Sequence, residues 1–381
     1  MAKSGKLLRS LIRAGTRTAK LFASVTAAAS SAAAPPKRKP RKKAGATAPR
    51  TAPRPAVPLK ARAAKPRATA LAATVRPAAV GNMRTRVVAT SSVAPGKWLS
   101  GHVPTAAGQR MNYWLYLPNA VPDKGMPLLV MLHGCQQTAT QFAQGTRMNL
   151  HAEKMGCAVL YPQQLVSNHP HRCWKWYERA TQDGGGEAAT IINVLHKVLA
   201  QYDFDRARIY VAGISAGAGM ANILALNHPQ LFAAVGLHSG PVFGAGHNTL
   251  GALSVMKNGA LGMGADLAAH EILRRHPQFP GMPAILFQGE SDNVVKAINQ
   301  SQLTRQSLLF NRLSGPPKIT SKRHYRLHDY YEGRKLLLRV AQVEQLEHAW
   351  SGGDATLAFN DRAGPNASKM MLEFFARHRR V

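Results

Sequence analysis

From about residue 93 onward, the apolar residues follow two different patterns. Short and almost wholly apolar runs, such as 127–132 and 284–288, are typical of strands that are buried on both faces. Longer segments lie between them, such as 186–202 and 216–227, and their apolar residues recur every three or four positions, as in amphipathic helices. Buried strands that alternate with helices predict an α/β fold with a mostly parallel sheet and helices on both faces.

The pattern gives a specific set of elements. The predicted strands cover residues 110–117, 127–132, 157–162, 208–212, 233–237, 284–288 and 335–346. The predicted helices cover residues 145–154, 186–202, 216–227, 297–313 and 365–379. Residues 242–281 are rich in Gly and Ala and fall between two strands, so we expect a small cap there, with a helix over 267–275.

One turn between a predicted strand and a predicted helix has the sequence G-I-S-A-G, residues 213–217. A strand, this pentapeptide and then a helix form the nucleophile elbow of serine esterases. The pentapeptide alone is common by chance, and its setting makes it informative. The serine of such a turn has a strained backbone, and a Cβ two residues before or after it would collide with the neighbouring strand or helix. We therefore predict an α/β-hydrolase fold with Ser215 as nucleophile.

Two further residues follow Ser215 in the order that this fold requires, acid and then histidine. Asp292 comes just past the strand 284–288, and His348 comes at the end of the run 335–346, at strand ends where ligands meet open α/β sheets. His348 would take the serine proton, and Asp292 would fix the imidazole tautomer. Three other acids are rivals for the second role: Glu290, Glu347 and Asp354.

The strand 127–132 continues into the sequence H-G-C-Q-Q. In this fold the loop after the third strand supplies one N–H of the oxyanion hole, and the residue after the nucleophile supplies the other. We therefore predict the N–H groups of Ala216 and Cys135 in this role, with Gln136 as the alternative to Cys135. We expect His133 to shape the loop rather than to relay a proton.

Together these motifs resemble the esterase family named for poly(3-hydroxybutyrate) depolymerases, which is similar to feruloyl and acetylxylan esterases. The segments that carry the resemblance are 132–137, 172–177, 213–219, 236–240, 288–295 and 347–353. The resemblance implies hydrolysis of carboxylic esters without a metal or an organic cofactor, and an extracellular setting. It assigns nucleophile, acid and base to the same three residues.

The resemblance leaves the ester open between a hydroxyalkanoate oligomer or polyester and an acyl or feruloyl-type ester. Extracellular depolymerases usually carry a linker and a polymer-binding domain after the catalytic domain, whereas this sequence ends at Val381, after the predicted last helix. We therefore keep soluble esters beside solid polyester as expected substrates. A lipase or a peptidase of the same fold stays an alternative, because fold and triad do not fix the bond that is cleaved.

Aromatic and sulfur-containing residues gather in the loops that we place near the site. We expect four aromatic residues to wall the substrate pocket, the alternative being ordinary core: Trp174, Trp176, Tyr177 and Trp350. A disulfide between Cys135 and Cys173 is a hypothesis that rests on this placement and on a secreted setting. Cys157 falls in a buried strand and is predicted to be an inert core thiol.

The first third of the chain and the remainder differ strongly in charge. Residues 1–122 hold 23 Lys and Arg and no Asp or Glu, whereas the remainder holds 27 basic and 18 acidic residues. Residues 22–81 have too few large apolar side chains to offset the entropy of ordering, so we predict a disordered basic tail over 1–92 and a catalytic domain over 93–381. Residues 1–90 could dock on a polyanion, an anionic membrane or a polyester granule; the alternative is a solvated linker. We predict no obligate protein partner.

Targeting signals are equivocal. Basic residues at positions 3 to 20 precede an Ala-rich stretch, and residues 1–34 together resemble a weak signal peptide. Extracellular, cytoplasmic and granule-associated locations therefore stay open. The sequence has no run of eighteen strongly apolar residues, so no transmembrane helix is predicted. A polyanion-binding or granule-binding protein with a secondary hydrolase domain is the alternative function from another class.

Overall fold

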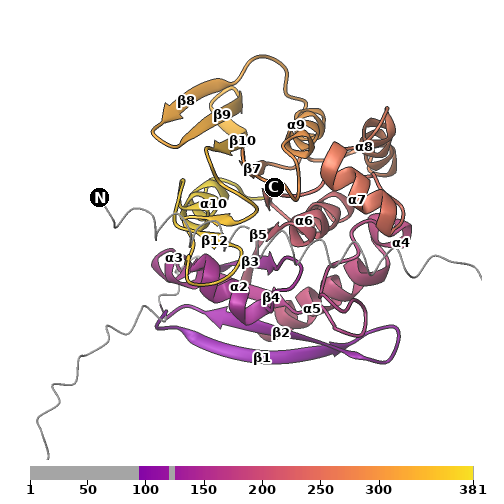
Figure 1. Cartoon of the computed structure of the whole chain (residues 1–381). Coiled ribbons are helices and arrows are strands. Elements are labelled where there is room, and N and C mark those ends of the chain that lie inside the picture. Colours follow the sequence, from indigo (N-terminus) through magenta and orange to yellow (C-terminus); the bar gives the residue numbers. More distant parts are fainter. Residues whose placement is uncertain (1–93, 120–124, 381) are drawn as a thin grey trace, which may run out of the picture. The chain divides into compact units, whose positions relative to one another are not determined.

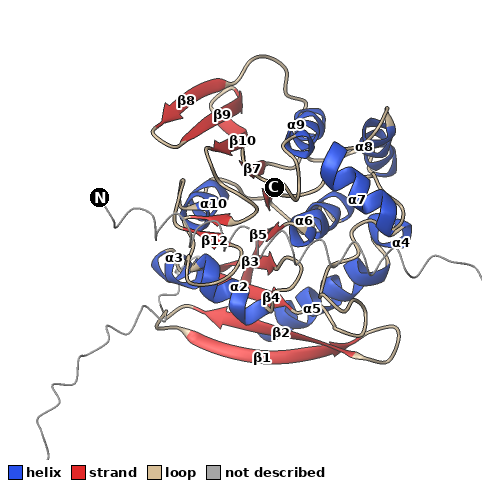
Figure 2. Ribbon diagram, viewed as in Figure 1, coloured by secondary structure: helices blue, strands red, loops and turns tan. Residues whose placement is uncertain are grey.

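The computed structural model describes residues 94–119 and 125–380. These residues form a ten-stranded sheet with helices packed on both faces (Figures 1 and 2), which confirms the predicted fold class. The predicted basic tail, its docking role and the signal-like segment 1–34 lie outside the described residues. Within the described part, no helix has the length and apolar character needed to cross a bilayer.

The sheet has a parallel centre and antiparallel ends, in the order β1-β2-β4-β3-β5-β6-β7-β10-β9-β8. The parallel strands are β3 (Met126–Leu132), β4 (Ala158–Pro162), β5 (Phe204–Ile214), β6 (Ala234–His238), β7 (Ala284–Gly289) and β10 (Lys335–Val343). The antiparallel strands are β1 (Lys97–Pro104), β2 (Arg110–Leu117), β8 (Lys318–Lys322) and β9 (Tyr325–Glu332). A separate two-stranded sheet pairs β11 (Trp350–Ser351) with β12 (Asn360–Asp361).

Helices cover the sheet on both sides. The helices are α2 (Ala139–Thr146), α3 (Met148–Lys154), α4 (Arg179–Gln182), α5 (Gly186–Gln201), α6 (Ala216–Asn227), α7 (Thr249–Asn258), α8 (Gly264–Arg275), α9 (Ile298–Phe310) and α10 (Ala367–Phe375). The core is double, because successive side chains of a strand point to opposite faces. Leu128 and Val130 of β3 join one apolar cluster with α5 and α6, whereas Leu129 and Met131 join another with α2, α3 and α10.

Several predicted boundaries need correction. The helix predicted over 145–154 is two helices, because Arg147 between α2 and α3 adopts a left-handed conformation with φ 53°. α2 starts earlier than predicted, at a capping box formed by Thr138 and Gln141. Strands β1, β8 and β9 and helix α7 were not predicted. β1 and β8 are edge strands with mostly exposed side chains, so they lack the apolar runs that mark the central strands.

Residues 242–281 contain α7 and α8, so the one helix predicted there is longer and has a neighbour. Both are fastened to α9 by amide side chains. Asn299 accepts the N–H of Val242 at 3.1 Å and donates to the carbonyl of Val255 at 2.9 Å. Gln306 donates to the carbonyls of Phe243 and Ala265. The role of this segment as a cap over a substrate stays a prediction.

Candidate active site

Ser215 stands between the end of β5 and the first residue of α6, with φ 57° and ψ −125°. A positive φ is unfavourable for a residue with a side chain, so the surroundings must impose it. The N–H of Ser215 donates to the carbonyl of His238 at 2.9 Å, and its carbonyl accepts the N–H of Gly219 at 3.1 Å. The strained serine therefore has the strand–turn–helix setting that the motif predicted.

Two glycines of the turn are required by close backbone approach. A Cβ on Gly213 would lie 2.4 Å from the carbonyl of Gly217, and a Cβ on Gly217 would lie 2.1 Å from the carbonyl oxygen of Leu132. Backbone atoms cannot yield as a flexible side chain can, so no larger residue fits at either position without moving the chain. The close approach also brings the turn against the end of β3, from which the loop 133–137 starts.

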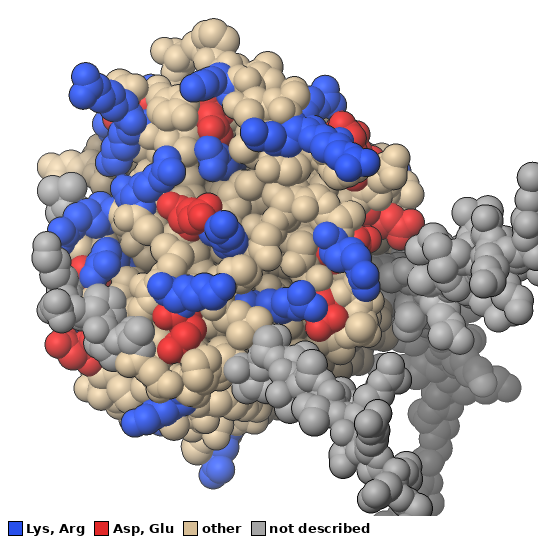
Figure 3. Space-filling model, turned by 90° about the vertical axis from the view of Figure 1, so that its left-hand side faces the viewer, with Lys and Arg blue, Asp and Glu red and all other residues tan. Residues whose placement is uncertain are grey.

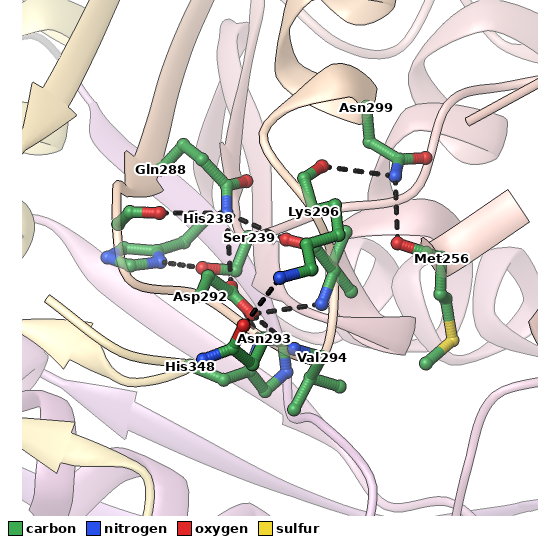
Figure 4. A network of polar contacts seen from close by, with 12 residues as sticks. His238, Ser239, Met256, Gln288, Asp292, Asn293, Val294, Lys296, Asn299 and His348 are labelled. Atoms are coloured by element: carbon green, nitrogen blue, oxygen red, sulfur yellow. Dashed lines mark hydrogen bonds and ion pairs between the residues drawn. The ribbon is translucent and has the colours of Figure 1, made fainter. Parts of the chain in front are cut away.

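Asp292 and His348 meet at the carboxyl ends of two neighbouring parallel strands, β7 and β10, whose last residues pair as Gly289 with Val343. Oδ2 of Asp292 lies 2.8 Å from Nδ1 of His348 (Figure 4). The two side chains are 0% and 6% exposed, respectively. Because β5, β6, β7 and β10 are consecutive in the sheet, Ser215 follows a strand that ends at the same edge.

Both oxygens of the Asp292 carboxylate accept hydrogen bonds. Oδ1 accepts the N–H groups of Val294 and Val295, both at 2.9 Å, and Oδ2 also accepts the side-chain amide of Gln288 at 3.1 Å. Burial alone would raise the pKa of Asp292, but the charge of His348 and the hydrogen bonds from its ring and from the two backbone N–H groups outweigh this effect, so the pKa is lowered. The ionised acid keeps a proton on Nδ1 and leaves Nε2 as the basic nitrogen of the ring.

Two of the three rival acids have ion-pair partners elsewhere. Glu290 forms an ion pair with Arg326 at 2.9 Å, and Asp354 forms one with Arg147 at 3.3 Å. Asp292 is therefore the predicted acid that the structure places against the imidazole.

His238 is a buried residue beside this pair, and no pattern in the sequence predicted its role. Its ring stacks between Phe287 and Trp350, with centroid distances of 5.5 and 5.0 Å. Nε2 accepts the N–H of Ser351 at 3.1 Å, so Nδ1 carries the proton and donates to the Ser239 hydroxyl. Burial, and then the charge of His348, lower the pKa of His238 to about 3, which keeps the ring neutral. His238 thus ties the end of β6 to the chain just past His348.

The loop 133–137 contributes backbone donors at the same edge. Gly134 donates its N–H to the Gln137 side chain at 2.9 Å, and Gln136 donates to the carbonyl of His171 at 2.6 Å. These bonds favour Cys135 over Gln136 as an oxyanion donor. The N–H of Ala216 belongs to the first turn of α6, where backbone donors have no partner within the helix.

His133 shapes this loop. Nδ1 donates to the carbonyl of Gly134 at 2.8 Å, so Nε2 is an acceptor and takes the N–H of Gln164 at 3.1 Å. Burial lowers the pKa of His133 to about 4, so the ring is neutral at pH 7. The expected structural role matches these contacts.

Two of the three cysteines form a disulfide that joins two loops, and the third is a free thiol. Cys135 and Cys173 form a disulfide, as predicted, so the loop 133–137 is covalently bound to the segment around residue 173. Cys157 is a buried free thiol, and burial raises its pKa to about 12, which suppresses the reactive thiolate.

The four aromatic residues expected in a pocket occupy different environments. Trp174 and Trp350 are 0% exposed, so the structure places them in the core, contrary to the expectation. Each indole N–H has a tertiary partner that local sequence cannot reveal, the His133 carbonyl for Trp174 and the Ser368 hydroxyl for Trp350. Trp176 is 4% exposed and packs edge-to-face on the half-buried Tyr177. These last two stay candidates for substrate contact.

Comparison with known proteins places this architecture in a family. Residues 111–325, more than half of the chain, match the family described as esterase PHB depolymerase. The chain belongs to this family. Within the described residues, no cluster of three or more His, Cys, Asp or Glu side chains is arranged to hold a metal ion.

Individual relatives are similar over part of their length. The chain is 29% identical over 210 residues to poly(3-hydroxyalkanoate) depolymerase C of Paucimonas lemoignei, which covers 54% of this chain and 50% of that protein. It is 32% identical over 165 residues to a probable acetylxylan esterase A of Aspergillus fumigatus, covering 40% and 43%. The chain thus spans about half the length of these curated relatives. The structure of an acetyl xylan esterase from Aspergillus awamori superposes with a TM-score of 0.60 at 18% identity, covering 73% of this chain and 99% of that one, which supports the fold.

Proposed function

We propose that this protein is a serine esterase that hydrolyses carboxylic esters through an acyl-enzyme. The observation that carries the proposal is the strained Ser215 at the edge of the sheet where His348 is held by the ionised Asp292. A strained nucleophile turn and a carboxylate-oriented imidazole at adjacent strand ends are the parts that acyl transfer needs. Membership of an esterase family supports the same reaction.

The proposed reaction has two halves. Ser215 Oγ attacks the ester carbonyl while Nε2 of His348 takes its proton, and the N–H groups of Ala216 and Cys135 stabilise the oxyanion. The tetrahedral intermediate expels the alcohol, which receives that proton from His348, and the acyl-enzyme remains. Water then gives a proton to His348 and attacks the acyl carbon, and collapse returns the proton to Ser215 and releases the acid.

We propose that the substrate is a hydroxyalkanoate oligomer or polyester, or an acyl or feruloyl-type ester. The names of the relatives, which include a poly(3-hydroxyalkanoate) depolymerase, acetylxylan esterases and feruloyl esterases, support this range. Trp176 and Tyr177 are the aromatic residues that we propose for substrate contact. Trp176→Ala should alter the preference among acyl chains, and an unchanged profile in a folded variant would remove Trp176 from this role.

Hydrolysis of p-nitrophenyl acetate, butyrate and octanoate tests the proposal. Ser215→Ala should lower kcat at least about a thousand-fold on every ester, as loss of the nucleophile does in other serine hydrolases. The matched control is Ser291→Ala, which removes an exposed hydroxyl from the loop that carries Asp292 and should leave the rates within two-fold. Equal rates in wild type and Ser215→Ala, both folded, would refute the assignment.

We propose polyanion binding by residues 1–90 as a second function. The supporting observation is the concentration of charge, since the first 122 residues have 23 basic and no acidic side chains. On the face of the domain drawn in Figure 3, acidic side chains lie among more numerous basic ones. Residues 1–90 alone should bind DNA with an affinity that falls steeply as salt rises. Binding that is absent at low salt would reject this function.

Extracellular export is part of the same proposal, with cytoplasmic and granule-associated locations as alternatives. The weakly signal-like residues 1–34 and the resemblance to secreted esterases support export. The N-terminal residue of the protein from its native source tests it. A start near residue 34 agrees with export, whereas an intact Met1 argues against cleavage.

A further inference from the structure

Glu187 is a buried carboxylate that the proposed reaction does not use. It lies in the first turn of α5 and is 8% exposed. Oε2 accepts the backbone N–H of Lys175 at 2.8 Å, and Oε1 accepts the side-chain amide of Gln164 at 2.6 Å. A third donor, the amide of Asn168, lies 3.5 Å from Oε1. All three donors belong to one long connection between β4 and α4.

This connection is also what holds the loop 133–137. The carbonyl of His171 accepts the N–H of Gln136, and Cys173 is bonded to Cys135. The indole N–H of Trp174 donates to the carbonyl of His133 at 3.0 Å. Three attachments thus join residues 171–174 to the loop that we propose as half of the oxyanion hole.

Gln164 connects the Glu187 carboxylate to the loop 133–137 through hydrogen bonds. Its side-chain amide, already bonded to Glu187, also donates to the carbonyl of Cys173 at 3.0 Å. Its backbone N–H donates to Nε2 of His133, and the same ring donates to the carbonyl of Gly134. From Glu187 to Gly134, each member is therefore in hydrogen-bond contact with the next.

We infer that Glu187 is a positioning residue for the oxyanion loop: from the rigid first turn of α5 it fixes residues 164 and 175, and through them the backbone N–H of Cys135. The inference rests on the proposed esterase function. Glu187 acts on the loop and does not itself contact the substrate in this proposal.

A carboxylate is the side chain that suits these neighbours. Lys175 and Gln164 both present donors, and an ionised carboxylate accepts at both oxygens, whereas a glutamine would turn its NH2 group toward one of them. Burial raises the pKa of Glu187, so the surroundings disfavour its charge overall.

Glu187→Gln tests the inference, with Glu153→Gln as the matched control. Glu153 likewise accepts one side-chain donor, the Tyr116 hydroxyl, and one backbone N–H, that of Asn119, but on α3. Glu187→Gln should lower kcat for p-nitrophenyl butyrate about ten-fold or more with KM within two-fold, because oxyanion contacts act in the transition state. The control should keep kcat within two-fold at matched loss of stability. Equal losses of kcat in the two variants would overturn the inference.

Gln164→Met provides a second variant, since it keeps the side-chain length and removes the amide. It should lower kcat as Glu187→Gln does, and the double variant should lose less than the product of the two single effects because both act in one network. A loss of kcat equal to the product of the two single losses would show that the two residues act independently and would reject the network.

Hydrogen exchange gives a readout that does not need activity. The amides of Gly134 and Gln136 should exchange at least ten-fold faster in Glu187→Gln than in wild type and stay unchanged in Glu153→Gln. Unchanged exchange in Glu187→Gln would refute the positioning role even if the protein proves not to be an esterase. Faster exchange in a protein whose Ser215→Ala variant keeps its activity would instead reject the reaction and retain the positioning.

Discussion

Replacement of Asp292 by Asn exchanges one oxygen for an NH2 group where the acid meets the imidazole. Oδ1 accepts two backbone N–H groups, so the single oxygen of an asparagine must stay on that side. The NH2 group then faces Nδ1 of His348 and the amide of Gln288, which occupy the other side. Two donors cannot share a hydrogen bond, so Nδ1 must become an acceptor and the ring proton must move to Nε2.

The size of the effect follows from this tautomer. In the proposed mechanism Nε2 takes the proton of Ser215, and in the variant it already carries one. The corresponding change in a well-studied serine protease lowers kcat about ten-thousand-fold. At about 1.36 kcal/mol per factor of ten, four factors correspond to about 5.4 kcal/mol of lost transition-state stabilisation. We expect Asp292→Asn to approach this value, because its surroundings leave the amide one orientation.

The assay is kcat for p-nitrophenyl butyrate at pH 7, on protein shown to be folded by its near-UV circular dichroism. Glu290→Gln is the matched control, since it changes a carboxylate in the same loop that pairs with Arg326 instead. The control should stay within two-fold of wild type. If Asp292→Asn kept more than a tenth of the wild-type kcat, or if Glu290→Gln lost as much, the reasoning would be wrong.

Three further predictions concern stability. Reduction of the disulfide, whose cysteines are 38 residues apart, should lower the free energy of unfolding by up to about 4 kcal/mol in urea titrations with and without reductant; no change would refute a stabilising link. Gly217→Ala should lower it by about 3 kcal/mol or more because of the clash with Leu132, whereas Gly264→Ala, whose Cβ meets nothing within 4 Å, should change it by less than about 1 kcal/mol; equal effects would contradict the close approach. Burial lowers the folded pKa of His238 to about 3, below an unfolded value of about 6.5, so its contribution to stability is complete above pH 6.5 and declines as pH falls toward 3. Between pH 6.5 and 5 this loss is about 1.7 kcal/mol, and His238→Gln should show a flatter pH profile of unfolding.

Much of the central sheet could be predicted because its strands are buried on both faces. The run 284–288 has no polar residue before Gln288, so it could be identified without knowledge of its neighbours. The positions of Asp292 and His348 followed from the same signal, since each was found by where a strand ends, whereas Ser215 was found by the pentapeptide G-I-S-A-G between a strand and a helix. Their catalytic roles stay predictions that the variants above test.

The remainder depends on contacts that local sequence does not contain. β8 is exposed on both faces, so its pairing with β9 leaves no apolar pattern. The burial of Trp174 depends on the carbonyl of His133, 41 residues away, and the stacking of His238 depends on rings from β7 and β11. Such tertiary partners decide whether an aromatic side chain near a site lines a pocket or supports a loop.

The way in which α9 holds the segment 242–281 has a consequence for evolution and for engineering. Asn299 and Gln306 form hydrogen bonds with main-chain N–H and C=O groups rather than with particular side chains. Any sequence that presents those backbone groups at the same places could be fastened by the same two amides. The sequence of this segment can therefore change without loss of these attachments, and exchange of its interior between relatives would leave the strand ends that bear Ser215 and Asp292 in register.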